Sequence, residues 1–306
     1  MTLWKGLYPL LYFSDMFDRD EFDSLVELLD DRDNVVSECV RNRLRQYGPD
    51  VVRELMALSF RQKDDSLKEM IRDTAADINS ENQLRKLEEL SGQGGGRLSL
   101  FEAGFIVSSI MDPSLQRDTF EDLFLRCSSE YVAESSDQRT AVENIRIFNH
   151  IFFHRLHFAI YDVEMSELKY ALISDALRTR QGNPFTVAYI YVMAAKFAGL
   201  PLEILTFPGG FVPIYVENGK ELFYINVYRN GEIFLKDRLT EFVSALGLNM
   251  DVTSFKVRDD NALLTIYLES LQYICSNAGE ERKSLALGQA LDILGSERFL
   301  SIDEEA

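Results

Sequence analysis

The sequence predicts a mostly helical α+β protein that contains one small antiparallel sheet. Apolar residues recur at helical spacing through most of residues 21–198, which indicates a series of amphipathic helices. Between residues 202 and 235, short runs rich in branched and aromatic residues alternate with glycine and asparagine turns, which is typical of strands. The helical pattern then returns and continues to about residue 294.

The N-terminal part, residues 1–95, is predicted to be a helical region. Three short helices are expected within residues 21–61, where Gly48 ends the second helix. Two of them would form an antiparallel pair that is similar to one HEAT unit. A longer charged helix or helix pair is expected over residues 65–90. The glycine run at 92–96 lacks the lysine and hydroxyl residue of a phosphate-binding loop, so we interpret it as a flexible connector.

The rest of the chain is predicted to contain three further parts. Residues 96–160 form a helical connecting region, residues 161–250 an α+β core, and residues 251–306 a helical hairpin with an acidic tail. The elements expected in the last two parts are helices over 166–180, 185–198, 240–246, 261–278 and 280–294, and strands over 202–207, 211–216, 222–227 and 233–235.

The charge balance restricts the partners that we expect. The 306 residues carry a formal net charge of −18, which repels the phosphates of nucleic acids and of anionic membranes. The apolar run at 7–13 contains Pro9 and leads into aspartates, so it predicts neither a signal peptide nor a membrane span. We therefore expect a cytoplasmic protein with neither a nucleic-acid nor a membrane partner.

The three cysteines, Cys39, Cys127 and Cys275, are far apart in the sequence and have no metal-ligand spacing. Each lies in a helical, amphipathic pattern. All three are therefore expected to be buried, reduced thiols, which fits a reducing compartment.

The segment around residues 184–226 is predicted to be a helix followed by strands, which is the arrangement that carries the catalytic residues of a cysteine hydrolase. Such enzymes place a thiol at a helix N-terminus, where the helix dipole lowers the thiol pKa, and a base and an acid on the strands that follow. Here the helix that opens at Pro184 offers Phe185 and Thr186, while Gly210 and Asn226 occupy the two strand positions. Glycine has no side chain that could act as a base.

The three histidines, His150, His154 and His157, predict a second candidate site. At helical spacing they fall within about 60° of one another, although the third ring would lie about 10 Å along the axis from the first. A metal ion could take one pair, His150 and His154 or His154 and His157, more easily than all three. The favoured interpretation is a partly buried helix face, and no cofactor is expected.

Several short motifs follow one another between residues 180 and 231. They are Arg180, Gly182, Pro184, the segment Pro208-Gly209-Gly210-Phe211, the segment Ile225-Asn226-Val227-Tyr228, and Gly231. Their order resembles that of the SirB-type proteins of the transglutaminase-like superfamily, whose pattern has arginine, glycine and proline, a helix, Pro-Gly-His-Phe, and then Ile-Asp-Pro-Phe with a glycine. Upstream, Asn149 to Phe158 is similar to the Asn-x-x-Leu-Phe-x-x-x-Gly-Phe segment of that family, and Phe101-Glu102-Ala103 with Asp112-Pro113 to its acidic helical segment.

The resemblance implies a papain-like, transglutaminase-like core with helical N- and C-terminal extensions, the latter a tetratricopeptide-like hairpin. It also implies a degenerate member of the family, in which the catalytic residues are replaced. Gly210 stands where the family has its histidine, Asn226 stands where it has its aspartate, and the cysteine position of the superfamily falls near Thr186. An acyl-transfer mechanism needs a base within hydrogen-bond reach of its nucleophile.

Two functional hypotheses follow. The favoured one is a non-catalytic pseudoenzyme that binds a protein or peptide in the former active-site cleft, which Gly210 would widen. The alternative is a hydrolase or acyltransferase with a displaced nucleophile or with a metal held by His150 and His154. The candidates for lining the cleft are Arg180, Asn183, Pro184, Phe185, Gly209, Phe211 and Tyr228.

Overall fold

The structure is a computed structural model that describes residues 18–31, 33–92, 98–136, 138–161, 167–207, 210–248, 251, 255–295, 297 and 299. The apolar run at 7–13, most of the glycine run, and Pro208 with Gly209 of the motif lie outside the described residues. The chain divides into two compact units, Met1–Asn82 and Gln83–Ala306.

The first unit is helical, and the three predicted short helices are confirmed. They are α1 (Arg19–Glu27), α2 (Asn34–Gln46) and α3 (Asp50–Arg61). The side chain of Asp18 caps α1, that of Asp33 caps α2, and Gly48 adopts a φ of 74° after α2. Their inward faces, together with the first turns of the next helix, form a core that includes Phe22, Val40, Leu44, Val51, Leu55, Ile71 and Ala75.

The charged segment after α3 forms one helix, α4 (Asp65–Gly92), rather than a helix pair. It begins in the first unit and ends in the second. Among the described residues, no helix combines the length and the apolar character needed to cross a bilayer.

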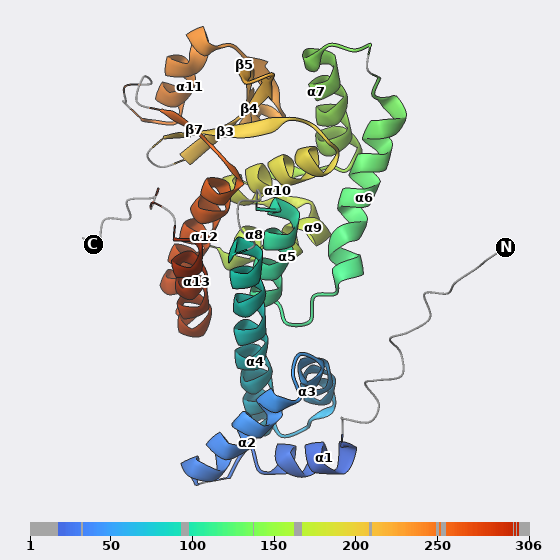
Figure 1. Cartoon of the computed structure of the whole chain (residues 1–306), viewed down its shortest axis with the longest axis vertical. Coiled ribbons are helices and arrows are strands. Elements are labelled where there is room, and N and C mark those ends of the chain that lie inside the picture. The colour runs from blue at the N-terminus through green and yellow to red at the C-terminus, as the bar shows by residue number, and fades with distance from the viewer. Residues whose placement is uncertain are drawn as a thin grey trace, which may run out of the picture. The chain divides into compact units, whose positions relative to one another are not determined.

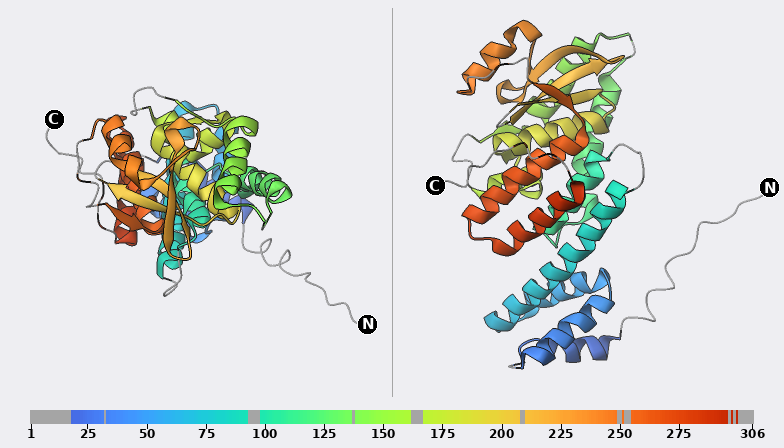
Figure 2. Two further views of the ribbon diagram at one scale, coloured as in Figure 1. Left: turned by 90° about the horizontal axis from the view of Figure 1, so that it is seen from above. Right: turned by 60° about the vertical axis from the view of Figure 1, so that its left-hand side comes forward.

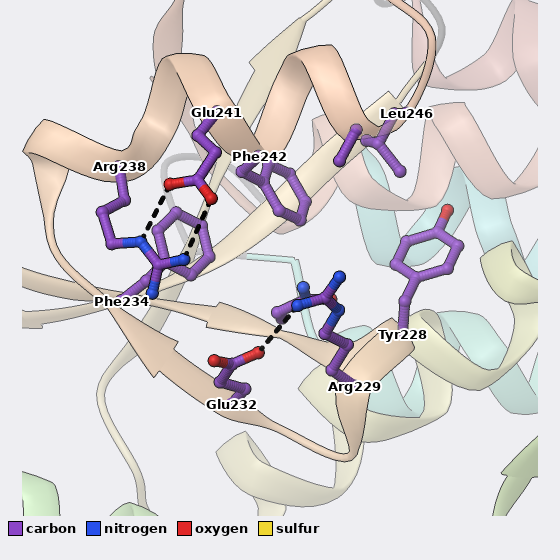
Figure 3. Close-up of a pocket in the computed structure, with 10 residues that line it drawn as sticks. Tyr228, Arg229, Glu232, Phe234, Arg238, Glu241, Phe242 and Leu246 are labelled. Carbon is purple, nitrogen blue, oxygen red and sulfur yellow. Dashed lines mark hydrogen bonds and ion pairs between the residues drawn. The ribbon is translucent and has the colours of Figure 1, made fainter.

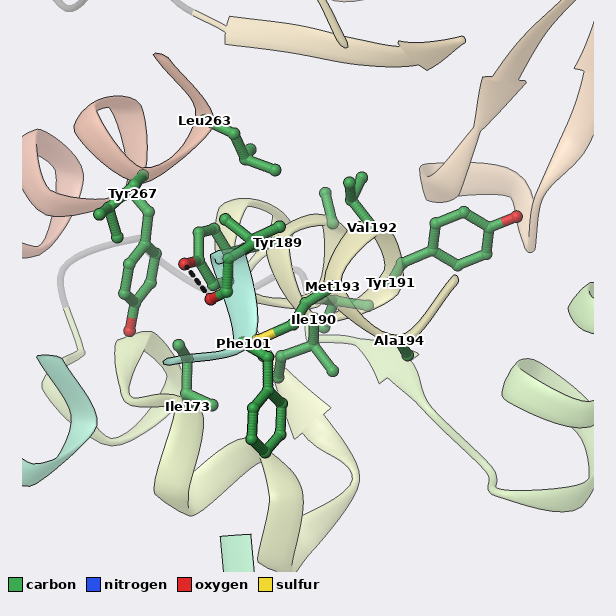
Figure 4. Packing of buried hydrophobic residues seen from close by; sticks show 14 of the residues in the cluster. Phe101, Ile173, Tyr189, Ile190, Tyr191, Val192, Met193, Ala194, Leu263 and Tyr267 are labelled. Atoms are coloured by element: carbon green, nitrogen blue, oxygen red, sulfur yellow. Dashed lines mark hydrogen bonds between the residues drawn. The ribbon is translucent and has the colours of Figure 1, made fainter. Parts of the chain in front are cut away.

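The second unit is built around helix α10 (Pro184–Phe197). Nearly all of its side chains are buried, which is expected of a helix that is apolar on every side. Tyr189 packs on Tyr267 of a neighbouring helix with ring centroids 4.6 Å apart (Figure 4). Tyr191 packs among Phe148, Phe152 and Phe153. The other helices of this unit are α5 (Leu100–Met111), α6 (Arg117–Glu134), α7 (Ala141–Asn149), α8 (Leu168–Ala171), α9 (Ile173–Thr179), α11 (Leu239–Ala245), α12 (Asp260–Asn277) and α13 (Glu281–Leu294).

The sheet is antiparallel and has the strand order β6-β5-β4-β3-β7. Helix α10 covers one face and α11 the other (Figures 1 and 2). Its strands are β3 (Leu202–Phe207), β4 (Gly210–Glu217), β5 (Lys220–Asn226), β6 (Glu232–Phe234) and β7 (Lys256–Arg258). The α10 face carries Leu202, Ile204, Phe211, Tyr215, Phe223 and Ile225, and the α11 face carries Leu205, Phe207, Val212, Ile214, Tyr224 and Phe234.

Three details differ from the sequence prediction. The edge strand β7 was not predicted, because it has only three residues, two of them basic. The segment predicted as one helix over 166–180 is divided at Leu172, whose extended backbone separates α8 from α9. A short parallel pair, β1 (Ala159–Ile160) with β2 (Gln181–Gly182), precedes α10.

Candidate functional site

The N-terminus of α10 is where the frame of a cysteine hydrolase would carry its nucleophile. Asn183 caps the helix by accepting a hydrogen bond from the backbone N–H of Thr186 at 2.8 Å, and Pro184 fills the first turn. Thr186 is completely buried, and its hydroxyl donates to the carbonyl oxygen of Ala171 at 2.9 Å. The same carbonyl accepts from the hydroxyl of Tyr267 at 2.9 Å. The Thr186 hydroxyl is therefore engaged inside the core.

The two strand positions of the predicted triad lie on the other face of the sheet. A Cβ built on Gly210 would lie 3.0 Å from the ring of Phe207, which belongs to the α11 face. Asn226 has the same parity as Tyr224 along β5 and likewise points to the α11 side. Thr186 lies in the helix that covers the opposite face. Gly210 is buried as well, so it does not widen a cleft beside α10 as expected but leaves room for the Phe207 ring.

The other residues predicted to line a cleft do not form one surface. Asn183, Pro184 and Phe211 are buried, and Phe185 is half-buried against the main core. Gly209 lies outside the described residues. Of the described candidates, Arg180 and Tyr228 line cavities, and these are two different cavities.

Arg180 ends α9 in the left-handed conformation, with a φ of 63°. Its guanidinium donates to the carbonyl oxygen of Leu177 and lies over the Phe158 ring, 5.5 Å from the centroid. Burial lowers the pKa of this guanidinium, and nearby Arg126 acts in the same direction. Arg180 lines a cavity of about 430 Å³ beside α6 and α9. The Arg180 side chain thus packs against its own helix end and an aromatic ring.

Tyr228 and Asn226 line a cavity between the edge of the sheet and α11, called the α11 pocket here (Figure 3). Its volume is about 290 Å³. Phe234 and Phe242 stack with centroids 5.0 Å apart and form an apolar wall. The full lining is Asn226, Tyr228, Arg229, Glu232, Phe234, Arg238, Glu241, Phe242, Ala245 and Leu246.

Charged pairs surround this apolar wall. Arg238 Nε lies 3.1 Å from Glu241 Oε2, and its guanidinium lowers the pKa of the Glu241 carboxyl. Arg229 lies 3.7 Å from Glu232. The Oδ1 atom of Asn226 is buried and has no hydrogen-bond partner within the described parts of the chain.

The thiols differ in exposure. Cys127 and Cys275 are buried as predicted, and burial raises their pKa values to about 12 and about 11. The prediction is wrong for Cys39, which is exposed, because the inward stripe of α2 is formed by Val40 and Leu44. At neutral pH both buried thiols are protonated, so neither is an activated nucleophile.

This difference predicts the reactivity of the thiols. In the native protein at pH 7 to 8, an aromatic disulfide reagent should modify Cys39 alone, and all three cysteines should react after unfolding in urea. Absorbance of the released thiolate counts the reactive groups, and mass spectrometry of digested protein locates them. Rapid modification of Cys127 or Cys275 in the folded protein would contradict the burial on which the prediction rests.

The histidines lie at the end of α7. A π-helical turn, His150–Arg155, follows α7, and the backbone N–H of Leu156 donates to Ile151 at 2.9 Å. The rings of His150 and His154 have centroids 5.4 Å apart, and both side chains are exposed. His157 has a φ of 59° beyond the helix end, so the three histidines do not form the single helical row that was expected. In the described part of the chain, no group of three or more His, Cys, Asp or Glu residues could hold a metal ion.

His150 and His154 line a polar cavity of about 480 Å³, called the α7 pocket here. Its lining is Arg146, Asn149, His150, His154, Arg229, Asn230, Gly231, Glu232 and Ile233. Arg146 and Arg229, the basic residues that accompany the histidines, are not among the site residues predicted from the sequence. The spacing of Arg146, His150 and His154, four residues apart, was the available signal.

The comparison with known protein families matches residues 117–265 to a family described as the transglutaminase-like superfamily. The chain therefore contains a transglutaminase-like superfamily domain, which extends from α6 into α12 and includes α10 and the five-stranded sheet. No curated protein and no solved structure matches the chain.

Proposed function

We propose that this domain is a non-catalytic, SirB-type member of the superfamily that binds a segment of another protein. The observation that carries the proposal is the state of Thr186, a fully buried residue whose hydroxyl donates to Ala171. Gly210 and Asn226 lie on the opposite face of the sheet, so they offer this hydroxyl neither a base nor an acid.

The proposal includes the helical regions that flank the core. We assign residues 1–95 to a HEAT-like helical region and residues 251–306 to a tetratricopeptide-like hairpin with an acidic tail. Paired helices of this kind commonly present binding surfaces for other proteins. The net charge of −18 favours a protein partner over nucleic acid, and we place the protein in the cytoplasm on its composition.

The α11 pocket is the proposed binding site for the segment of the partner protein. It combines aromatic side chains with a few charged groups, which is the usual composition of a site that fixes the orientation of a ligand. Tyr228 is 44% exposed at its border and can cover an incoming side chain. Aromatic residues of this kind contribute strongly to protein interfaces.

The proposal predicts that Tyr228→Ser weakens peptide binding by about tenfold, the loss expected of an aromatic contact residue worth about 1.4 kcal/mol. The measurement is a titration of isotope-labelled full-length protein with unstructured peptides that alternate leucine with glutamate, glutamine or lysine. The changes in NMR chemical shift on titration should concentrate on residues of the α11 pocket. Tyr273→Ser is the matched control, because Tyr273 is similarly exposed, at 47%, on α12.

Two results would contradict this function. One is an absence of binding by all three peptide classes. The other is catalysis, seen as ammonia release from a glutamine-containing peptide or as covalent labelling of Thr186 by an electrophilic acyl donor. The second result would restore the hydrolase or acyltransferase hypothesis.

A further inference from the structure

A basic ridge lies along the end of α7 in an otherwise acidic protein. Arg146, His150 and His154 follow one another at four-residue intervals, all three are exposed, and all three line the α7 pocket. Arg229 from the segment before β6 joins them there. Glu232 is the one acidic residue in the lining, and it lies 3.7 Å from Arg229. The pocket therefore carries a local excess of positive charge and of hydrogen-bond donors.

The ridge is held firmly against strand β6. The side chain of Asn149 donates from Nδ2 to the carbonyl oxygen of Gly231 at 2.7 Å. Its Oδ1 accepts from the hydroxyl of Tyr191, on α10, at 2.7 Å. Because Asn149 lies between Arg146 and His150 in the chain, these bonds fix the position of this helix end relative to the strand. A preorganised site loses less conformational entropy when a ligand binds.

Strand β6 lies at one edge of the five-stranded sheet and separates the two pockets. Phe234 lines the α11 pocket, Ile233 lines the α7 pocket, and Glu232 reaches both. A strand that pairs with an exposed edge places successive side chains on opposite faces. An added strand at β6 would thus direct alternate side chains toward an aromatic pocket and toward a basic pocket.

We infer that the edge of β6 binds an extended acidic segment of a partner protein by strand addition. Apolar side chains of this segment enter the α11 pocket, and its alternate carboxylates pair with Arg146, His150 and His154. Charge complementarity selects this occupant, because a basic or neutral segment would leave the ridge unpaired. The inference rests on the proposed binding function and names the class of partner and its mode of binding.

The test uses full-length protein and a labelled ten-residue peptide that alternates leucine with glutamate. Fluorescence anisotropy should give tighter binding for this peptide than for its leucine–glutamine counterpart, with a difference that shrinks as salt is raised. Arg146→Gln should weaken binding about two- to fivefold, and Arg146→Gln combined with His150→Gln and His154→Gln about tenfold or more. Arg139→Gln, an exposed arginine just before α7, is the matched control and should leave affinity unchanged.

Backbone N-methylation tests the pairing itself. Two further peptides carry methyl groups on alternate amides, one on the leucine positions and one on the glutamate positions. Only one of these sets faces β6 in an added strand, so one peptide should lose binding and the other should keep it. Equal binding of both methylated peptides would overturn strand addition.

The outcomes separate this inference from the proposed function. If the glutamate and glutamine peptides bind equally and the ridge variants change nothing, while Tyr228→Ser still weakens binding, the acidic partner is excluded and the binding function remains. If none of the glutamate, glutamine and lysine peptides binds, both are excluded.

Discussion

Replacing Gly231 by alanine is expected to destabilise the transglutaminase-like domain by about 3 kcal/mol or more. Gly231 has a φ of 78°, a left-handed conformation that costs other residues roughly 1–2 kcal/mol. A Cβ at this position would also lie 2.3 Å from Cγ and Oδ1 of Asn149, so one of the two segments must move. That movement would break the hydrogen bond from Asn149 to the Gly231 carbonyl.

Scanning calorimetry measures this effect, because it can resolve separate transitions in a chain with two compact units. A loss of this size should lower the midpoint of one transition by about 6–12 °C. Gly219→Ala is the matched control: Gly219 has a φ of 73° in the β4–β5 turn, but a Cβ there would meet no atom within 4 Å. The difference between the two variants isolates the contact with Asn149.

A double-mutant cycle identifies the cause. Asn149→Ala alone leaves the buried Tyr191 hydroxyl and the Gly231 carbonyl without this partner, which should cost about 1–3 kcal/mol. Combined with Gly231→Ala, it removes the steric conflict. The double variant should therefore lose less stability than the sum of the losses of the two single variants. Strict additivity, or equal losses for Gly231→Ala and Gly219→Ala, would show that Asn149 does not constrain this turn.

The spacing of apolar residues predicted the helices and strands well where each one buries a regular row of apolar side chains. The helical spacing of apolar residues anticipated α1 to α3 and the α12–α13 hairpin, and branched residues between turn signals anticipated β3 to β5. The mostly helical α+β class with a small antiparallel sheet is thus confirmed, and the family comparison confirms a transglutaminase-like superfamily domain. The SirB branch remains a prediction.

The candidate site was harder to predict, because its geometry depends on the face of the sheet toward which each side chain points rather than on residue type. The motif identified Gly210 and Asn226 as positions of interest, but a pattern in the sequence does not say that both point toward α11. The α11 pocket depends in addition on how α11 packs over the sheet edge. The α7 pocket is lined by both Arg146 and Gly231, which are far apart in the chain, and Asn149 links the two segments by a hydrogen bond to the Gly231 carbonyl.

A second large effect is expected at the charged pair that joins α10 to α12. Lys196 and Asp260 form a salt bridge in which their side chains are only 17% and 10% exposed. Each charge also complements a helix dipole, because Lys196 lies in the last turn of α10 and Asp260 in the first turn of α12. Lys196→Met should therefore cost about 3–5 kcal/mol, because it removes the cation of this salt bridge from a carboxylate that has little access to water.

The expected loss arises from the carboxylate that loses this cation, and a second substitution tests that cause. In Lys196→Met/Asp260→Leu no carboxylate remains, so the double variant should be more stable than Lys196→Met alone, as seen by urea denaturation. Lys283→Met is the matched control: Lys283 lies 3.1 Å from Glu280, but these side chains are 34% and 42% exposed, so its loss should stay below about 1 kcal/mol. If Lys196→Met is no more destabilising than Lys283→Met, the salt bridge does not stabilise the packing of α12 on α10, which then rests on core contacts such as that between Tyr189 and Tyr267.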